Sequence, residues 1–67
     1  MNDNELDLLN EHQAAQKLGL SVATLRRRRL LHQAPTWIKL GARVLYRASD
    51  LQKWISENTI HVGRKAN

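Results

Sequence analysis

The stretch SVATLRRRRLL, residues 21–31, decides the fold predicted for this chain of 67 residues. A serine at an N-cap accepts a hydrogen bond from the unpaired N–H groups of a first helical turn, so we expect a helix to begin after Ser21. Gly19, just before it, can take the left-handed conformation that ends a preceding helix. A helix that ends at glycine, followed at once by a second capped helix, has the spacing of a helix-turn-helix.

The four consecutive arginines of this second helix cannot share one role, because each helical residue advances 100° around the axis. Val22 and Leu25 define the side that faces the core. Arg27 falls nearly opposite, where it is best placed for the edge of a base. Arg26 and Arg28 fall on the two flanks, where phosphates are the expected partners.

Arg29 falls back over the core side of the same helix. We expect its stem to lie on apolar surface and its charged head to lie near the helix C-terminus, where a cation is favoured. Leu30 and Leu31 would point outward if the helix continued. We therefore expect the helix to end there and both leucines to turn back toward the core.

Two further helices are indicated by capping patterns on either side. Asn10, with Gln13 three residues later, forms a capping box for a helix over residues 11–18. Ser49 is the expected N-cap of a last helix that runs to Asn58. Its apolar stripe at helical spacing is expected to close the core. This stripe consists of Leu51, Trp54 and Ile55.

A β-hairpin is predicted between the second and last helices. Residues 36–40 and 43–47 are short runs rich in β-forming residues, separated by Gly41 and Ala42. Alternation within each run predicts one packed face and one basic face. The packed face is expected to carry Ile38, Leu40, Val44 and Tyr46, and the basic face Lys39, Arg43, Leu45 and Arg47.

The charge distribution favours a polyanionic partner. Eleven Lys and Arg residues against six Asp and Glu give a formal charge of +5, and no acidic residue lies between His12 and Ser49. A concentrated positive field of this kind favours fast, salt-sensitive binding to nucleic acid, although a solvated basic face kept for solubility is the alternative. We divide the chain into an acidic flexible arm at 1–7, a folded domain at 8–58 and a flexible basic tail at 59–67.

Several function classes find no support in the sequence. The three histidines, His12, His32 and His61, are scattered, and neither a Gly-rich phosphate loop nor metal-ligand spacing is present. We expect no enzyme activity, no metal, no cofactor and no small-molecule ligand. The absence of cysteine excludes disulfides, and the acidic N-terminus lacks the long apolar run of a signal peptide or membrane span. We therefore expect a cytoplasmic protein associated with the nucleoid.

Two blocks of sequence carry a resemblance to a known family. LLNEHQAAQKLGLSVATLRRR, residues 8–28, and IKLGARVLYRASDLQKWI, residues 38–55, resemble the excisionase and AlpA-like branch of the MerR-type winged helix-turn-helix proteins. The resemblance implies an α+β fold. We expect a small winged helix-turn-helix of three helices, with a two-stranded β-hairpin wing between helices 2 and 3.

The resemblance also implies a binding site for double-stranded DNA. The helix that begins after Ser21 would lie in the major groove, and the hairpin would follow the adjacent backbone or minor groove. The expected major-groove residues are Ser21, Ala23, Thr24, Arg26 and Arg27. The expected phosphate contacts are Lys17, Arg28 and Lys39, and the wing residues are Arg43 and Arg47.

Three functions are compatible with this pattern. An excisionase-type protein binds and bends attachment-site DNA and recruits integrase, either alone or with further copies on adjacent sites. An AlpA-like protein instead regulates transcription of phage or mobile-element genes, with RNA polymerase as the partner. We favour the excisionase type, because the sequence shows neither the long dimerisation helix nor the sensor region of MerR activators. The third alternative is a protein-interaction module that uses Trp37, Leu45 and the arginines against an acidic partner.

Overall fold

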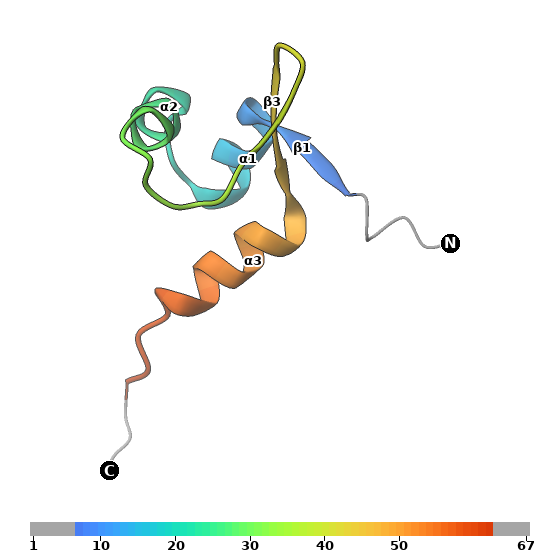
Figure 1. Cartoon of the computed structure of the whole chain (residues 1–67). Coiled ribbons are helices and arrows are strands. Elements are labelled where there is room, and N and C mark those ends of the chain that lie inside the picture. The colour runs from blue at the N-terminus through green and yellow to red at the C-terminus, as the bar shows by residue number, and fades with distance from the viewer. Residues whose placement is uncertain (1–6, 63–67) are drawn as a thin grey trace.

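The computed structural model describes residues 7–62 of the chain. Most of the predicted arm, residues 1–6, and the end of the predicted tail, residues 63–67, lie outside the described part. Three helices and one antiparallel three-stranded sheet make up the described fold (Figure 1). In chain order the elements are β1 Leu8–Asn10, α1 Glu11–Leu18, α2 Val22–Leu30, β2 Ile38–Leu40, β3 Arg43–Arg47 and α3 Ala48–Glu57. The α+β helix-turn-helix architecture is therefore confirmed.

The turn between α1 and α2 follows the predicted capping chemistry. Asn10 and Gln13 form a reciprocal capping box, in which each side chain accepts from the backbone N–H of the other, at 2.8 and 2.9 Å. Gly19 ends α1 in the left-handed conformation, with φ at 71°. Ser21 then caps α2 by accepting from the Thr24 N–H at 3.0 Å. These local bonds fix the direction in which α2 leaves α1.

The sheet has one strand more than expected. β1 pairs antiparallel with β3 and places Leu9 opposite Tyr46, so the strand order is β1-β3-β2. The pairing continues past the strand end, where Ala48 N–H donates to the Asp7 carbonyl at 3.0 Å. The hairpin of β2 and β3 is thus anchored to the N-terminal end of α1 through β1, which immediately precedes that helix.

The predicted division of side chains between the two sheet faces was confirmed for β3 but wrong for β2. The two-residue loop pairs Leu40 with Arg43, and Ile38 with Leu45, so Ile38 and Leu40 lie on the face opposite Tyr46. Directly opposed residues share a face of the sheet. In each of these pairs an even-numbered residue of one strand lies opposite an odd-numbered residue of the other, so the even positions of β2 share a face with the odd positions of β3. The packed face carries Leu9, Lys39, Val44 and Tyr46; the outer face carries Leu8, Ile38, Leu40, Arg43, Leu45 and Arg47.

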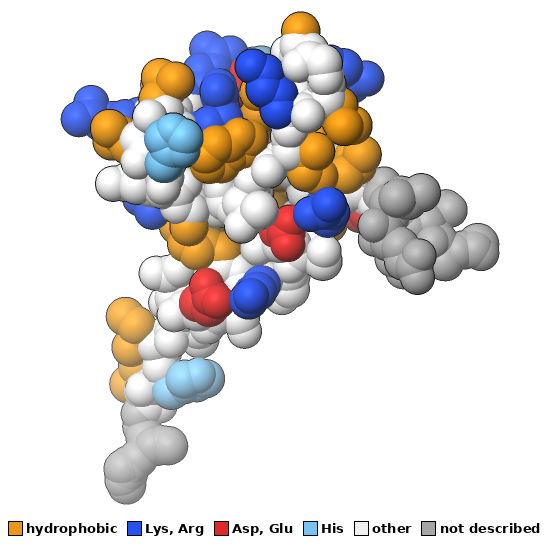
Figure 2. Space-filling view, viewed as in Figure 1, with side chains coloured by type: hydrophobic (Ala, Val, Ile, Leu, Met, Phe, Trp, Pro, Cys, Tyr) orange, Lys and Arg blue, Asp and Glu red, His pale blue; other side chains and the backbone are white. Residues whose placement is uncertain are grey.

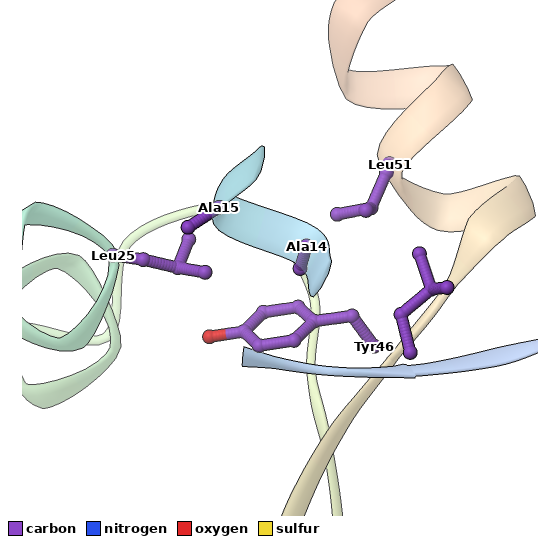
Figure 3. Close-up of a cluster of buried hydrophobic side chains, with 6 residues drawn as sticks. Ala14, Ala15, Leu25, Tyr46 and Leu51 are labelled. Atoms are coloured by element: carbon purple, nitrogen blue, oxygen red, sulfur yellow. The ribbon is translucent and has the colours of Figure 1, made fainter. Parts of the chain in front are cut away.

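The core lies between the helices and the packed face of the sheet. Ala14 of α1 lies between the Tyr46 ring and Leu51 of α3, and Leu25 of α2 packs beside Ala15 (Figure 3). Ala14 and Ala15 are buried, and because their side chains are small, α2 and the sheet can approach α1 closely. The core therefore holds α2 by one side and leaves its opposite side free.

Two expectations about helix ends were wrong. α3 begins at Ala48, with Arg47 as an N-cap that makes no side-chain capping bond, so Ser49 lies in the first turn. The Ala48 N–H, which is free at the first helical position, is bonded to the Asp7 carbonyl, and the helix starts two residues earlier than expected. α2 ends at Leu30 as expected, but Leu30 and Leu31 are exposed rather than turned into the core.

Candidate nucleic-acid interface

The free side of α2 forms a shallow, open surface. It is lined by Ala23, Thr24, Arg26, Arg27 and Leu30. Four of the five residues expected in the major groove are thus brought together on one face, because Leu25 and Val22 anchor the other side of the helix to the core. A straight, exposed helix face with small residues first and arginines after them can enter the major groove of B-DNA.

Ser21, the fifth expected groove residue, lies at the beginning of this face. Its hydroxyl accepts from the Thr24 N–H at 3.0 Å and donates to the Thr24 hydroxyl at 2.9 Å. The Ser21 oxygen is therefore occupied with the helix end, and Thr24 is held in a fixed rotamer. Thr24 presents a methyl group and a hydroxyl at the surface, both usable against a base edge.

Arg26 is held by an acidic residue that the sequence analysis did not assign to the site. Its Nε donates to the two Glu11 carboxylate oxygens at 3.2 and 3.1 Å, and its Nη2 donates to Oε2 at 2.9 Å. Arg29 Nη2 lies 3.7 Å from the other oxygen, Oε1. One carboxylate in the first turn of α1 therefore faces two of the four arginines of α2.

The electrostatics of this cluster favour its charged state. The hydrogen bond from Arg26 is the main cause that lowers the pKa of Glu11, with further help from the charges of Arg26, Arg29 and His12 and some opposition from burial. The same bond raises the pKa of Arg26. Glu11 is thus a carboxylate and Arg26 a guanidinium at any pH at which the protein would bind DNA.

A signal for Glu11 was present in the sequence. An arginine placed over the core side of a helix requires an anion or acceptors for its buried guanidinium. Glu11 is the last acidic residue before the long basic stretch, and it lies in the first turn of the helix that packs against α2. A search for the counter-ion of Arg29 would have found it.

Arg29 follows the predicted path only in part. Its side chain is 21% exposed, so the stem does cover apolar surface. Its head, however, points toward Glu11 and the buried Tyr46 hydroxyl, not toward the C-terminus of its own helix. The carboxylate supplies a full negative charge, which outweighs the partial charge of a helix end. Burial raises the pKa of Tyr46, and the nearby Arg29 charge partly opposes that rise.

Arg28 lies on the other flank of α2 and is engaged within the fold. Its Nε donates to the Ala34 carbonyl at 2.6 Å, and its guanidinium lies over the Trp54 ring of α3, 4.9 Å from the centroid. Among the described residues, Arg27 makes no hydrogen bond or ion pair through its side chain, and it is exposed. The four arginines therefore have different surroundings, and Arg27 lies on the exposed side of α2, as the helical angles predicted.

The cations predicted beside the groove lie on the hairpin and at the end of α1. Lys39 and Arg43 are exposed and line one hollow with Arg29 and Glu11, between the hairpin and the beginning of α1. Arg47 pairs with Asp50 at 3.2 Å, so part of its charge is already compensated. Lys17 is exposed in the last turn of α1.

The positive charge is gathered on one part of the molecule. In Figure 2, most blue side chains lie around the part that holds α2 and the hairpin, whereas α3 carries acidic as well as basic groups. This asymmetry matches the long acid-free stretch of the sequence. A surface of this kind attracts and orients a polyanion before close contact is made.

Other kinds of site are not formed by the described residues. Within residues 7–62 no group of three or more His, Asp or Glu side chains is placed to hold a metal ion. No helix in that range has the length and apolar character needed to cross a membrane.

The residues of the protein-interaction alternative are also poorly placed, since Trp37 packs against the core and Leu45 is only 6% exposed.

Comparison with known proteins gives one clear match. The family model described as "Helix-turn-helix domain" matches residues 8–59, most of the chain and nearly all of its described part. No curated protein and no solved structure matches the chain. The family match agrees with the capped α1-turn-α2 unit and with the exposed basic face of α2. The chain therefore belongs to the helix-turn-helix domain family of DNA-binding proteins.

Proposed function

We propose that this protein binds a specific double-stranded DNA site, with α2 in the major groove and the β2–β3 hairpin beside it as a wing. The observation that carries the proposal is the free face of α2, where Thr24, Arg26 and Arg27 are exposed side by side on one rigid helix. Phosphate contacts position such a domain, and contacts with base edges give it sequence preference.

The hairpin supplies the positioning contacts in this proposal. Lys39 and Arg43 carry charges that no described acidic residue neutralises, and they stand across the hollow from the beginning of α1. Arg47 contributes less, because Asp50 already pairs with it. Arg28 braces the fold through Ala34 and Trp54, and in this proposal its remaining N–H groups bind a phosphate. Lys17 reaches a phosphate from the end of α1.

The biological role proposed is that of an excisionase-type factor, which bends attachment-site DNA and recruits integrase. Its support is the resemblance of residues 8–28 and 38–55 to that branch, together with the family match. An AlpA-like regulator of transcription would use the same interface. With a single small domain on each site, the bending would depend on several copies or on the partner protein.

Duplex binding measured against salt tests the interface. With about five phosphate contacts, the logarithm of affinity falls with the logarithm of salt at a slope of roughly −4 to −5. Arg43→Ala is expected to reduce the slope by about 0.9 and to leave sequence preference unchanged. The matched control is Lys53→Ala, which removes the same charge from an exposed position of α3. Absence of duplex binding even at low salt would contradict the proposal.

The two biological roles are separated by a second experiment. Purified protein is added to a recombination reaction that contains the integrase and attachment-site DNA of the element carrying its gene. A shift toward excision supports the excisionase role. If recombination does not respond and a neighbouring promoter does, the protein is a transcription regulator.

A further inference from the structure

Glu11 leaves three N–H groups of Arg26 free, and two of them form the end-on edge of the guanidinium. The carboxylate takes the edge formed by Nε and Nη2, with distances of 2.9 to 3.2 Å. A guanidinium has five N–H groups in a fixed plane, so both N–H groups of Nη1 and one of Nη2 remain. One N–H of Nη1 and the remaining N–H of Nη2 form the end-on fork, whose parallel N–H bonds match the O6 and N7 acceptors of guanine.

Glu11 also fixes where that fork points. An unrestrained arginine loses rotamer freedom when it binds, and a partner that already holds it removes most of that cost. The Arg26 side chain is still 51% exposed, and it shares the free face of α2 with Thr24 and Arg27. Arg26 is thus both preset by Glu11 and accessible to a duplex.

The charge of Glu11 decides which acceptor suits Arg26. A carboxylate next to the guanidinium repels an approaching phosphate, whereas a guanine edge carries no net charge. The same carboxylate faces Arg29, so half of the four-arginine run is partly neutralised. Arg27 has no such partner among the described residues and keeps its full attraction for any duplex.

We propose that Arg26 is the arginine that reads a guanine, and that Glu11 is the positioning residue that gives it this specificity. This inference rests on the proposed function. It reverses the roles expected from helical angles alone, in which Arg27 reads a base and Arg26 contacts a phosphate. Arg27 becomes a major source of sequence-independent attraction along α2.

The experiment compares binding to a preferred duplex with binding to random sequence. A preferred site is selected by the wild-type protein from a pool of random duplexes. The dissociation constants for that site and for the pool are then measured by fluorescence anisotropy at several salt concentrations. The variants are Glu11→Gln, Arg26→Ala and the double variant. The control is Glu57→Gln, which makes the same charge change at an exposed position in the last turn of α3.

Glu11→Gln is expected to lower the ratio of the two affinities by roughly tenfold, within the range for one bidentate base contact. It should also tighten binding to the pool and steepen the salt slope by about 0.9, because the released Arg26 can reach a phosphate. Arg26→Ala should lower the ratio by a similar factor, and adding Glu11→Gln to it should lower the ratio no further. Glu57→Gln should leave the ratio unchanged.

A purely structural role for Glu11 would give a different result. Glu11→Gln would then lower the melting temperature and leave both the ratio and the salt slope as in the wild type, which would overturn the inference. Arg26→Lys gives an independent test without removing Glu11, since it keeps the charge but lacks the fork. It should lower the ratio at an unchanged salt slope, and an unchanged ratio would overturn the inference. If the wild type binds the pool but selects no preferred site, the proposed function and this inference both fail.

Discussion

Arg28 on α2 and Trp54 on α3 are in direct contact, with the guanidinium 4.9 Å from the ring centroid. The two helices each pack against α1, and this contact joins them to one another as well. The Arg28 Nε also donates to the Ala34 carbonyl in the segment between α2 and β2. The last turn of α2 is therefore tied to two other parts of the fold.

Arg28→Ala is expected to destabilise the protein by about 1–2 kcal/mol, from the loss of a charge-assisted hydrogen bond and a cation–π contact. In a domain of this size each kcal/mol corresponds to a fall of roughly 4–8 °C in melting temperature. The fall in melting temperature is measured by thermal unfolding followed by circular dichroism. Arg27→Ala, on the exposed side of the same helix, is the matched control and should change stability by less than about 0.5 kcal/mol. Equal stability of the two variants would contradict the bracing role.

Tyr46→Phe tests the buried hydroxyl. The Tyr46 side chain is 1% exposed, and its hydroxyl, directed toward α2 (Figure 3), has no hydrogen-bond partner among the described residues. Removing a buried polar atom that lacks a partner costs little, so the free energy of unfolding should change by less than about 1 kcal/mol. Tyr46→Ala should remove about 3–5 kcal/mol and leave much of the protein unfolded. Urea unfolding of both variants distinguishes packing from polar contributions.

The alkaline pH dependence of the same variants checks the argument. Because burial raises the pKa of Tyr46 above its ordinary value of 10.0, the unfolded chain loses this proton first as pH rises. Stability that is present below pH 10 is therefore lost as the pH increases through the pKa of the folded state. Tyr46→Phe should remove this part of the pH dependence. If it persists in full, other groups are responsible.

Short-range chemistry explains which parts of the fold could be predicted. Asn10, Gln13, Gly19 and Ser21 act within three or four residues along the chain, and each was assigned its correct role. Helical geometry alone likewise places Leu25 and Arg27 on opposite sides of α2. The exposed face of α2 was therefore predictable from the sequence.

The errors concern relations between distant segments. The sheet faces depended on how β2 and β3 are paired, and a shift of one residue moves every side chain to the other face. β1 is too short to show alternation, and its partner Tyr46 is far away in the sequence. The bond from Ala48 to Asp7 moved the start of α3 in the same way. Glu11 and Arg26 are fifteen residues apart, so only the packing of α1 on α2 brings them together.

Acid is expected to weaken the link between α1 and α2. The folded-state pKa of Glu11 is held below its ordinary value of 4.5, chiefly by the Arg26 hydrogen bond. A group with a lowered pKa contributes stability above its unfolded pKa, and this contribution is lost as pH falls through the folded value. Urea midpoints from neutral pH down to about pH 3 should fall less steeply for Glu11→Gln than for the wild type. Glu57→Gln is the control, and an identical slope for Glu11→Gln and the wild type would contradict the link.

Ser21→Asp separates helix capping from DNA contact at one position. Aspartate is as good an N-cap as serine, and its charge is favoured at a helix N-terminus, so stability should be unchanged or slightly raised. Ser21 also lies at the beginning of the free face of α2, where a new negative charge would approach DNA phosphates. Duplex affinity should therefore fall, and more at low salt than at high salt. Melting temperature and anisotropy measured on the same samples give the two readouts.

Ser49→Asp is the matched control for this prediction, because it makes the same change at an exposed position in the first turn of α3. Both variants have the same net charge, so a difference between them reports where the charge lies relative to DNA and not how much charge there is. Ser21→Asp should weaken duplex binding several-fold more than Ser49→Asp. An equal loss would mean that the beginning of α2 does not face the duplex. The placement of the helix in the groove would then have to be abandoned, even if the protein binds DNA.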